Sequence, residues 1–208
     1  RSKSIVLISN TFWTLFRFRY EIIKHLVNKG FEVHLIAEMD GYENKLMNDD
    51  SISCHNVKFS GRSINPFNEL KIFFTIRKIL SDIKPVYIFS YTIKPNIYSG
   101  FLCKRLKINH IPMVTGLGHF FNSLKNPLKL IIHYMIKKSF LSASEVWFTN
   151  TSDEKYYIDK IRVFGPFTNN HEIGDSLEQF MKSPDVEMLD ASLFSVNFLV
   201  NCLYFFNL

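Results

Sequence analysis

An alternation of apolar runs with helical patterns is the feature that most restricts what this chain can fold into. Short, nearly continuous apolar runs occur at residues 4–9, 31–38, 54–59, 86–91, 111–115 and 145–150. The segments between them carry apolar residues at helical spacing, at 15–29, 65–82, 96–106 and 127–141. A strand, a helix and a further strand in that order require a crossover connection, which favours parallel pairing. The sequence therefore predicts an α/β fold with a doubly wound parallel sheet.

The composition fits one sizeable domain, or one domain with a fragment of a second. The chain has 208 residues, of which 47% are hydrophobic and 21% are charged, so it is globular rather than disordered. Its formal charge of +6 suits an anionic partner, such as a phosphate, a nucleic acid or an anionic membrane surface. The basic residues are scattered and match no nucleic-acid recognition motif, so a nucleic-acid partner is not expected.

Neither a metal site nor a disulfide framework is predicted. The three cysteines, Cys54, Cys103 and Cys202, are far apart and show no metal-ligand spacing with histidine. This usage indicates a reducing, cytoplasmic setting. The chain has no run of eighteen apolar residues, so no transmembrane helix is expected from the sequence.

Polar residues follow four of the predicted strands. They are Asn10 and Thr11, then 94–96, 116–119 and 150–152. The carboxyl ends of parallel strands meet at one edge of the sheet, and ligands of such sheets bind beyond that edge. The sequence therefore predicts one binding crevice that all four loops line.

The stretch "SYTIKPNIYSG", residues 90–100, carries the strongest polar signal. Lys94 brings a point charge suited to a phosphate. Asn96 is expected to cap the following helix, whose first amides also attract anions. The simpler alternatives are a solvated loop lysine for Lys94 and an ordinary helix cap for Asn10 and Asn96.

A second stretch, "VTGLGHFFN" at residues 114–122, follows the next strand. Gly116 and Gly118 allow the backbone to approach a ligand closely or to adopt a positive φ. His119 can donate to a phosphate or exchange a proton near neutral pH. An ordinary strand-to-loop turn and a structural histidine are the alternatives.

Four segments together resemble the N-terminal half of bacterial family 4 glycosyltransferases of the GT-B fold. They are "SNTFWTLFRFRYEIIKHLVNKGFEVHLIAEMDGY", "GRSINPFNELKIFFTIRKIL", "SYTIKPNIYSG" and "VTGLGHFF". Within that family the chain is similar to enzymes that build capsule, O-antigen or other glycans on undecaprenyl diphosphate. The resemblance runs over about residues 3–160 and implies a Rossmann-like domain at 1–160.

The resemblance implies sugar transfer from a nucleotide sugar, expected to be a UDP-sugar, to an acceptor linked to undecaprenyl diphosphate. It implies an enzyme at the inner face of the cell membrane, with no metal and no cofactor. In this fold the N-terminal domain holds the acceptor, and His119 is the candidate catalytic residue by position alone. The residues implied for acceptor and phosphate binding are Asn10, Thr11, Arg62, Lys94, Asn96, Thr115, Gly116 and Gly118.

Two helical segments combine apolar, aromatic and basic residues. They read "WTLFRFRYEIIKHL" at 13–26 and "NPLKLIIHYMIKKSFL" at 126–141. Such helices can lie in the lipid headgroup region without crossing the bilayer. The alternative is that both are core-packing helices with solvated lysines.

The last quarter, residues 161–208, resembles a fragment of the donor-binding domain of these enzymes, truncated or degenerate. The family's pair of glutamates separated by seven residues is absent, because no glutamate here has another eight positions on. The sequence leaves three hypotheses open. They are a glycosyltransferase inactive by itself, a non-catalytic acceptor-binding subunit of a split glycosyltransferase, and a different α/β enzyme or nucleotide binder.

Overall fold

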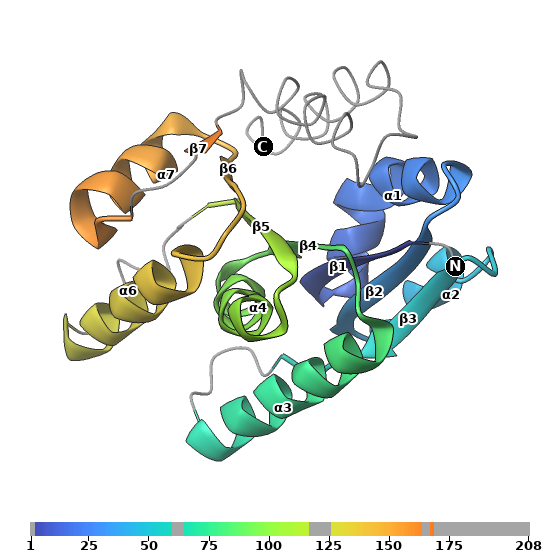
Figure 1. The fold of residues 1–208 in the computed structure, drawn as a ribbon, viewed down its shortest axis with the longest axis horizontal. Helices are drawn as coiled ribbons and strands as arrows, with labels where there is room; N and C mark the ends of the chain where they lie inside the picture. Colours follow the sequence, from blue (N-terminus) through green and yellow to red (C-terminus); the bar gives the residue numbers. More distant parts are fainter. Residues whose placement is uncertain (1–2, 60–64, 117–125, 164–166, 169–208) are drawn as a thin grey trace.

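A single parallel sheet organises the chain (Figure 1). The computed structural model describes residues 3–59, 65–116, 126–163 and 167–168. Within them, seven strands form one sheet in the order β3-β2-β1-β4-β5-β6-β7, and every neighbouring pair is parallel. The predicted doubly wound α/β fold is thereby confirmed. The strands are β1 (Ser4–Thr11), β2 (Glu32–Glu38), β3 (Ile52–Asn56), β4 (Tyr87–Tyr91), β5 (Asn109–Val114), β6 (Val146–Phe148) and β7 (Phe167–Thr168).

The helices lie on both faces of the sheet. They are α1 (Phe12–Asn28), α2 (Glu43–Leu46), α3 (Pro66–Ile83), α4 (Ile93–Leu106), α6 (Asn126–Phe140), α7 (Thr151–Tyr156) and the π-helical turn η1 (Tyr157–Ile161). Alternate side chains of β1 point to opposite faces, as in any strand. Ile5 and Leu7 pack with α1 in one apolar core. Val6 and Ile8 pack in a second core that includes residues of α3, α4 and α6.

Most element boundaries agree with the sequence patterns to within a few residues. Asn65 is the N-cap of α3, since its side chain accepts a hydrogen bond from the amide of Phe67 at 3.0 Å. The predicted start of the next helix at Asn96 is wrong, because α4 begins at Ile93. Pro95 therefore lies in the first turn of α4, where a missing amide proton costs no helical hydrogen bond.

The sheet continues past the predicted domain boundary at residue 160. Strand β7 at residues 167–168 pairs in parallel with β6, so this short segment belongs to the same sheet. Residues 169–208 lie outside the described part of the chain, and the boundary itself stays a prediction.

Helices α4 and α6 approach each other closely at Gly100. A Cβ atom added to Gly100 would lie 2.4 Å from the backbone oxygen of Ser139 on α6 and 2.7 Å from its Cβ. A contact this short with a neighbouring backbone forces the helices apart, so a glycine is needed at this crossing.

We expect Gly100→Ala to lower the free energy of unfolding by about 2 kcal/mol, because overpacking outweighs the gain in helix propensity. Urea unfolding followed by circular dichroism measures the change. Ser99→Ala is the matched control, because the buried hydroxyl of Ser99 has no hydrogen-bond partner in the described part of the chain. That variant should be as stable as the parent or more so. A Gly100→Ala protein at least as stable as the parent would contradict the proposed close approach.

Candidate functional site

The order in which successive strands are added to the sheet reverses at β1, between β1 and β4. From β1 the chain proceeds to β2 and β3 on one side, and then returns to form β4 on the other side of β1. In open α/β sheets, ligands bind beyond the carboxyl ends of the strands at this switch point. The register places Ile8 opposite Ser90, so Ser9 and Asn10 emerge beside Tyr91 and Thr92.

Thr92 has an unusual backbone conformation at this edge. Its φ of 71° and ψ of 162° fall in a region that glycine almost alone adopts. Residues held there cost on the order of 1–3 kcal/mol and persist only where the surroundings fix them. Thr92 joins β4 directly to α4, and its side chain makes no capping hydrogen bond. The strand therefore passes into the helix through one strained residue.

A buried chain of hydrogen bonds holds the first turn of α4 against β4 and β5. The hydroxyl of Ser90 donates to Oδ1 of Asn96 at 2.6 Å. Since its one proton is used there, Ser90 Oγ accepts from Nε2 of His110, 2.7 Å away. Nδ2 of Asn96 in turn donates to the backbone oxygen of Met113 at 3.0 Å. These bonds fix the turn that contains Thr92.

The hydrogen-bond directions also determine the state of His110. The ring is fully buried, and burial lowers its pKa to about 3. It is therefore neutral at physiological pH and carries its proton on Nε2. Asn96 is only 2% exposed and both ends of its amide are engaged within the protein. Its side chain therefore stabilises the edge of the sheet from inside the protein, through its bonds to β4 and β5.

Three oxygen atoms at the switch point lack hydrogen-bond partners among the described residues. They are Oγ of Ser9, Oδ1 of Asn10 and Oγ1 of Thr92, and all three are buried. An unsatisfied buried polar atom costs on the order of 1–3 kcal/mol, so such a group calls for an explanation. A ligand that brings several hydroxyl groups, such as a sugar, has the donors that these oxygens need.

Lys94 lies just inside α4 and is engaged with α3. Its ammonium nitrogen is 2.8 Å from Oε1 of Glu69, and the two side chains are 25% and 18% exposed. The hydroxyl of Tyr98 donates to Oε2 of the same carboxylate. Glu69 is in the first turn of α3, so this cluster joins the beginnings of α3 and α4. The structure thus places the Lys94 charge at the expected edge but pairs it with an acid.

The remaining predicted site residues have separate positions. Thr11 is the N-cap of α1 and accepts from the amide of Thr14 at 3.2 Å. Thr115 and Gly116 follow β5, and Gly116 has the positive φ, 127°, that the sequence suggested. Arg62, Gly118 and His119 lie outside the described residues. The binding and catalytic roles of all the predicted residues stay predictions.

Sequence reasoning missed the strained backbone of Thr92 and the parts that Ser90, His110 and Glu69 play in supporting this edge. Ser90 and Thr92 stand within the stretch that was singled out, but no local pattern indicates a strained φ or an unsatisfied oxygen. Among the residues that the structure describes, no three histidine, cysteine or acidic side chains gather as a metal site would require. None of the helices found between residues 3 and 163 has the length and hydropathy to span a bilayer.

Comparison with known proteins identifies the family. Residues 4–150 match the family described as "Glycosyl transferase 4-like", and the chain belongs to this family. A curated relative is N,N'-diacetylbacillosaminyl-diphospho-undecaprenol alpha-1,3-N-acetylgalactosaminyltransferase of Campylobacter jejuni, 31% identical over 156 residues. The match covers 73% of this chain and 41% of that relative, so the chain spans well under half of the relative's length. The predicted resemblance to family 4 glycosyltransferases is confirmed.

Solved structures share the fold. A glycosyltransferase from Rickettsia africae ESF-5 has a TM-score of 0.60 at 14% identity, over 89% of this chain and 50% of that chain. UDP-N-acetylglucosamine 2-epimerase from Rickettsia bellii has a TM-score of 0.56 at 15% identity, over 91% and 52%. A transferase and an epimerase therefore share this architecture, and the function has to be argued from the site.

The free energy of unfolding should decrease as the pH falls below about 6.5. His110 is neutral in the folded protein because burial lowers its pKa to about 3, whereas the unfolded chain takes up a proton below the ordinary value of 6.5. The contribution of His110 to the free energy of unfolding is thus intact above pH 6.5 and is lost towards pH 3, at about 1.4 kcal/mol per pH unit. Urea unfolding at about pH 7.5 and about pH 5.5 measures this loss.

His110→Gln is the matched variant for this measurement. Glutamine can place a nitrogen donor near the position of Nε2 and cannot be protonated in this range. We expect it to lose less stability between the two pH values than the parent does. Burial also lowers the pKa of His34 and His55. The parent and the His110→Gln variant both keep these residues, so their effect cancels when the two proteins are compared. Identical pH dependence in the two proteins would show that His110 is not the titrating group.

Proposed function

We propose that this member of the glycosyl transferase 4-like family binds the lipid-linked sugar acceptor of a glycosyl transfer reaction. The acceptor would be a sugar on undecaprenyl diphosphate, and the transferred sugar would come from a nucleotide sugar, a UDP-sugar. The observation that carries the proposal is the group of oxygens at the β1/β4 switch point that lack partners among the described residues; one of them belongs to Thr92, the N-cap of the helix whose second residue is Lys94. The name of the Campylobacter relative supports the acceptor class.

The sugar end of the acceptor is assigned to the switch point. Hydroxyl groups donate well to the side-chain oxygens of Ser9, Asn10 and Thr92, which lack partners among the described residues. A site built to hydrogen-bond a hydroxyl rejects analogues that lack it, because its own polar groups are then left unpaired. These three oxygens would therefore contribute to selection of the acceptor sugar.

The diphosphate is assigned to Lys94 and the start of α4. The first amides of a helix of 14 residues attract an anion, and the lysine adds a full positive charge. The lysine is already paired with Glu69, so binding exchanges one carboxylate for a more highly charged diphosphate. Glu69 keeps the hydroxyl of Tyr98 as a partner after the exchange. This second bond lowers the cost of releasing the lysine.

Transfer also requires a site for the nucleotide sugar. The departing nucleoside diphosphate carries negative charge that must be stabilised as the bond to the sugar breaks. We assign this role to a region outside the family match at residues 4–150, either a second domain or a separate subunit. The described domain alone would then bind the acceptor without transferring sugar to it.

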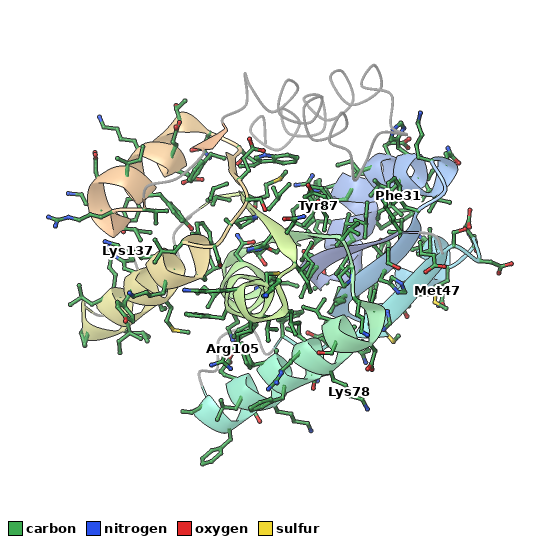
Figure 2. All side chains as sticks on the ribbon, viewed as in Figure 1. Phe31, Met47, Lys78, Tyr87, Arg105 and Lys137 are labelled. Atoms are coloured by element: carbon green, nitrogen blue, oxygen red, sulfur yellow. The ribbon has the colours of Figure 1, made fainter. Side chains whose placement is uncertain are left out.

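A membrane-surface location is part of the proposal, at the inner face of the cell membrane. Helix α1 fits the core-packing alternative, because Phe12, Leu15 and Ile23 are all buried. Helix α6 instead exposes Leu130, Ile131 and Tyr134 by 68%, 56% and 62%, with two lysines in its last turn. Figure 2 shows Lys78 on α3, Arg105 on α4 and Lys137 on α6, the three helices of one layer. Exposed apolar side chains beside lysines suit an anionic lipid surface.

We expect Lys94→Ala to weaken binding of a water-soluble, short-chain polyprenyl-diphosphate sugar by about tenfold, the value of one charge-assisted contact. Isothermal titration calorimetry on the full chain measures the dissociation constant. Lys104→Ala is the matched control, because Lys104 is exposed in the last turn of the same helix, at the end opposite to Lys94. Equal losses in the two variants would overturn the assignment of the diphosphate to Lys94.

Glu69→Gln separates the ligand contact from a purely structural ion pair. If Lys94 serves the ligand, the glutamine releases it and acceptor binding becomes severalfold tighter, at a cost of about 1 kcal/mol in stability. If the pair only joins α3 to α4, Lys94→Ala and Glu69→Gln destabilise the fold alike and neither changes acceptor binding. That second result would contradict the proposed function of the lysine.

A further inference from the structure

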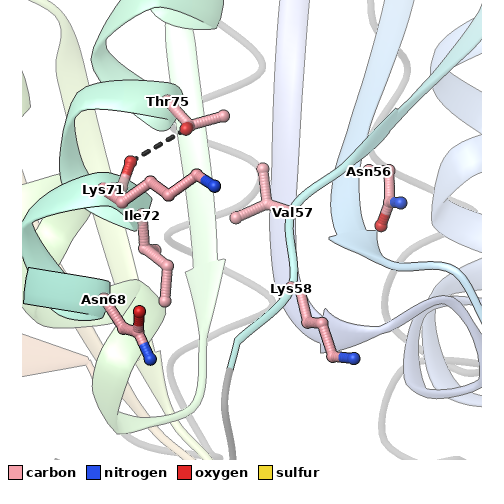
Figure 3. Close-up of a pocket in the computed structure, with 7 residues that line it drawn as sticks. All are labelled: Asn56, Val57, Lys58, Asn68, Lys71, Ile72 and Thr75. Carbon is pink, nitrogen blue, oxygen red and sulfur yellow. Dashed lines mark hydrogen bonds between the residues drawn. The ribbon is translucent and has the colours of Figure 1, made fainter. Parts of the chain in front are cut away.

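A second polar site lies away from the switch point, between β3 and α3 (Figure 3). It is a groove of about 460 Å³ beside the carboxyl end of β3. Val57 and Ile72 are buried and give it apolar surface. The other described residues that line it are polar or basic, and they are Asn56, Lys58, Asn68, Lys71 and Thr75. No carboxylate is among these lining residues.

The lysines take up different positions around the groove. Lys71 extends from α3 toward Val57, and Asn68 turns toward the same gap from one turn earlier (Figure 3). Lys58 lies on the opposite wall with its ammonium group turned away from α3. Its side chain is exposed and has a flexible stem, so it can reach an anion in the groove. The main positive group of the site is therefore Lys71, with Lys58 as the second.

An exposed apolar stripe borders the groove along the same helix. Phe67, Leu70 and Phe74 are 82%, 54% and 54% exposed, and they follow one another at helical spacing. Each precedes one groove residue by one position, which corresponds to a rotation of about 100° around the helix axis. The stripe and the groove wall thus run side by side on α3. Large apolar side chains exposed in a row indicate a binding surface.

We propose that the groove binds the phosphate of an anionic phospholipid headgroup, while the stripe enters the apolar boundary of the same membrane. The inference rests on the membrane-surface location proposed above and adds a specific headgroup site to it. Lys71 donates to the phosphate, Lys58 closes over it, and Asn68 supplies a neutral donor. A soluble phosphate compound would use the groove but would leave the aromatic stripe in water. The pairing of the two features therefore favours a lipid.

Charge on the rest of α3 agrees with this assignment. Arg77 and Lys78 continue the positive charge along the helix, and both are exposed. Glu69, the acid that follows Asn68 in the sequence, accepts from Lys94 and Tyr98 and so faces α4. Except for Asp82 in the last turn, the exposed side of α3 therefore presents cations and apolar groups together, which is the composition of helices that lie in the headgroup region.

Co-sedimentation of the full chain with lipid vesicles tests the proposal. The vesicles are phosphatidylcholine alone, or phosphatidylcholine containing phosphatidylglycerol. Lys78→Ala is the control, since it removes the same charge from the same helix outside the groove, and it should cost about fivefold in affinity for the anionic vesicles. We expect Lys71→Ala to cost more than tenfold and Lys58→Ala an intermediate amount. All these positions are exposed, and circular dichroism verifies that each variant is folded.

A second measurement distinguishes the lipid from a soluble phosphate. Glycerophosphoglycerol, the headgroup of phosphatidylglycerol without its acyl chains, is titrated into the parent and into the double variant with Phe67→Ser and Phe74→Ser. We expect weak binding of the fragment that depends on Lys71 and is the same in both proteins, while the double variant loses vesicle binding. Tight fragment binding together with unchanged vesicle binding in the double variant would overturn the lipid assignment.

Equal losses for Lys71→Ala and Lys78→Ala would overturn the groove as a site, because general charge attraction would then explain vesicle binding. This failure is separate from failure of the proposed function. Acceptor binding by the soluble short-chain analogue depends on Lys94 and needs no vesicle. A protein that binds anionic vesicles through Lys71 but ignores the acceptor analogue would keep this inference and refute the acceptor assignment.

Discussion

Parallel pairing of β1 on both of its sides is the constraint from which the site follows. A strand in the middle of a parallel sheet needs crossover connections on each side, and its apolar run must be buried on both faces. Ile5, Val6, Leu7 and Ile8 are at most 1% exposed, so β1 meets this requirement completely. The carboxyl ends of β1 and β4 must then emerge together. The polar residues that follow these strands are neighbours because of this topology, although more than eighty positions separate them in the sequence.

The turn at Thr92 shows how the interior supports the edge. A strained residue persists only when its surroundings cost more to rearrange than the strain releases. Here the surroundings include the buried hydrogen bonds of Ser90, Asn96 and His110, which are valuable because no water can replace them. Loss of one member leaves the others unsatisfied in the core. The neutral state of His110 thus helps to fix the conformation of this edge, although His110 itself does not lie at the edge.

The fold is predictable from the sequence because buried parallel strands are continuous apolar runs and amphipathic helices have a clear period. Proline is the reason for the error at the start of α4, since Pro95 is compatible with a first turn as well as with a loop. The rule that ligands bind at carboxyl ends identifies Asn10 and Lys94 as candidates. It cannot identify Glu69, 25 positions from Lys94, because their pairing depends on how α3 packs beside α4. Nor can it identify the strain of Thr92, which is a property of backbone angles alone.

Helix α3 links the two proposed sites through three of its faces. Glu69 is paired with Lys94 at the start of α4, Lys71 lines the groove beside β3, and Phe67 and Phe74 are exposed. Because an α-helix is rigid over two turns, the Cα atoms of these residues keep fixed distances from one another. A headgroup held at the groove would therefore fix the height of the crevice above the membrane. The diphosphate of a lipid-linked acceptor lies at the level of the headgroups. Anchoring α3 to a phospholipid headgroup would therefore place Lys94 at the level at which the acceptor diphosphate arrives.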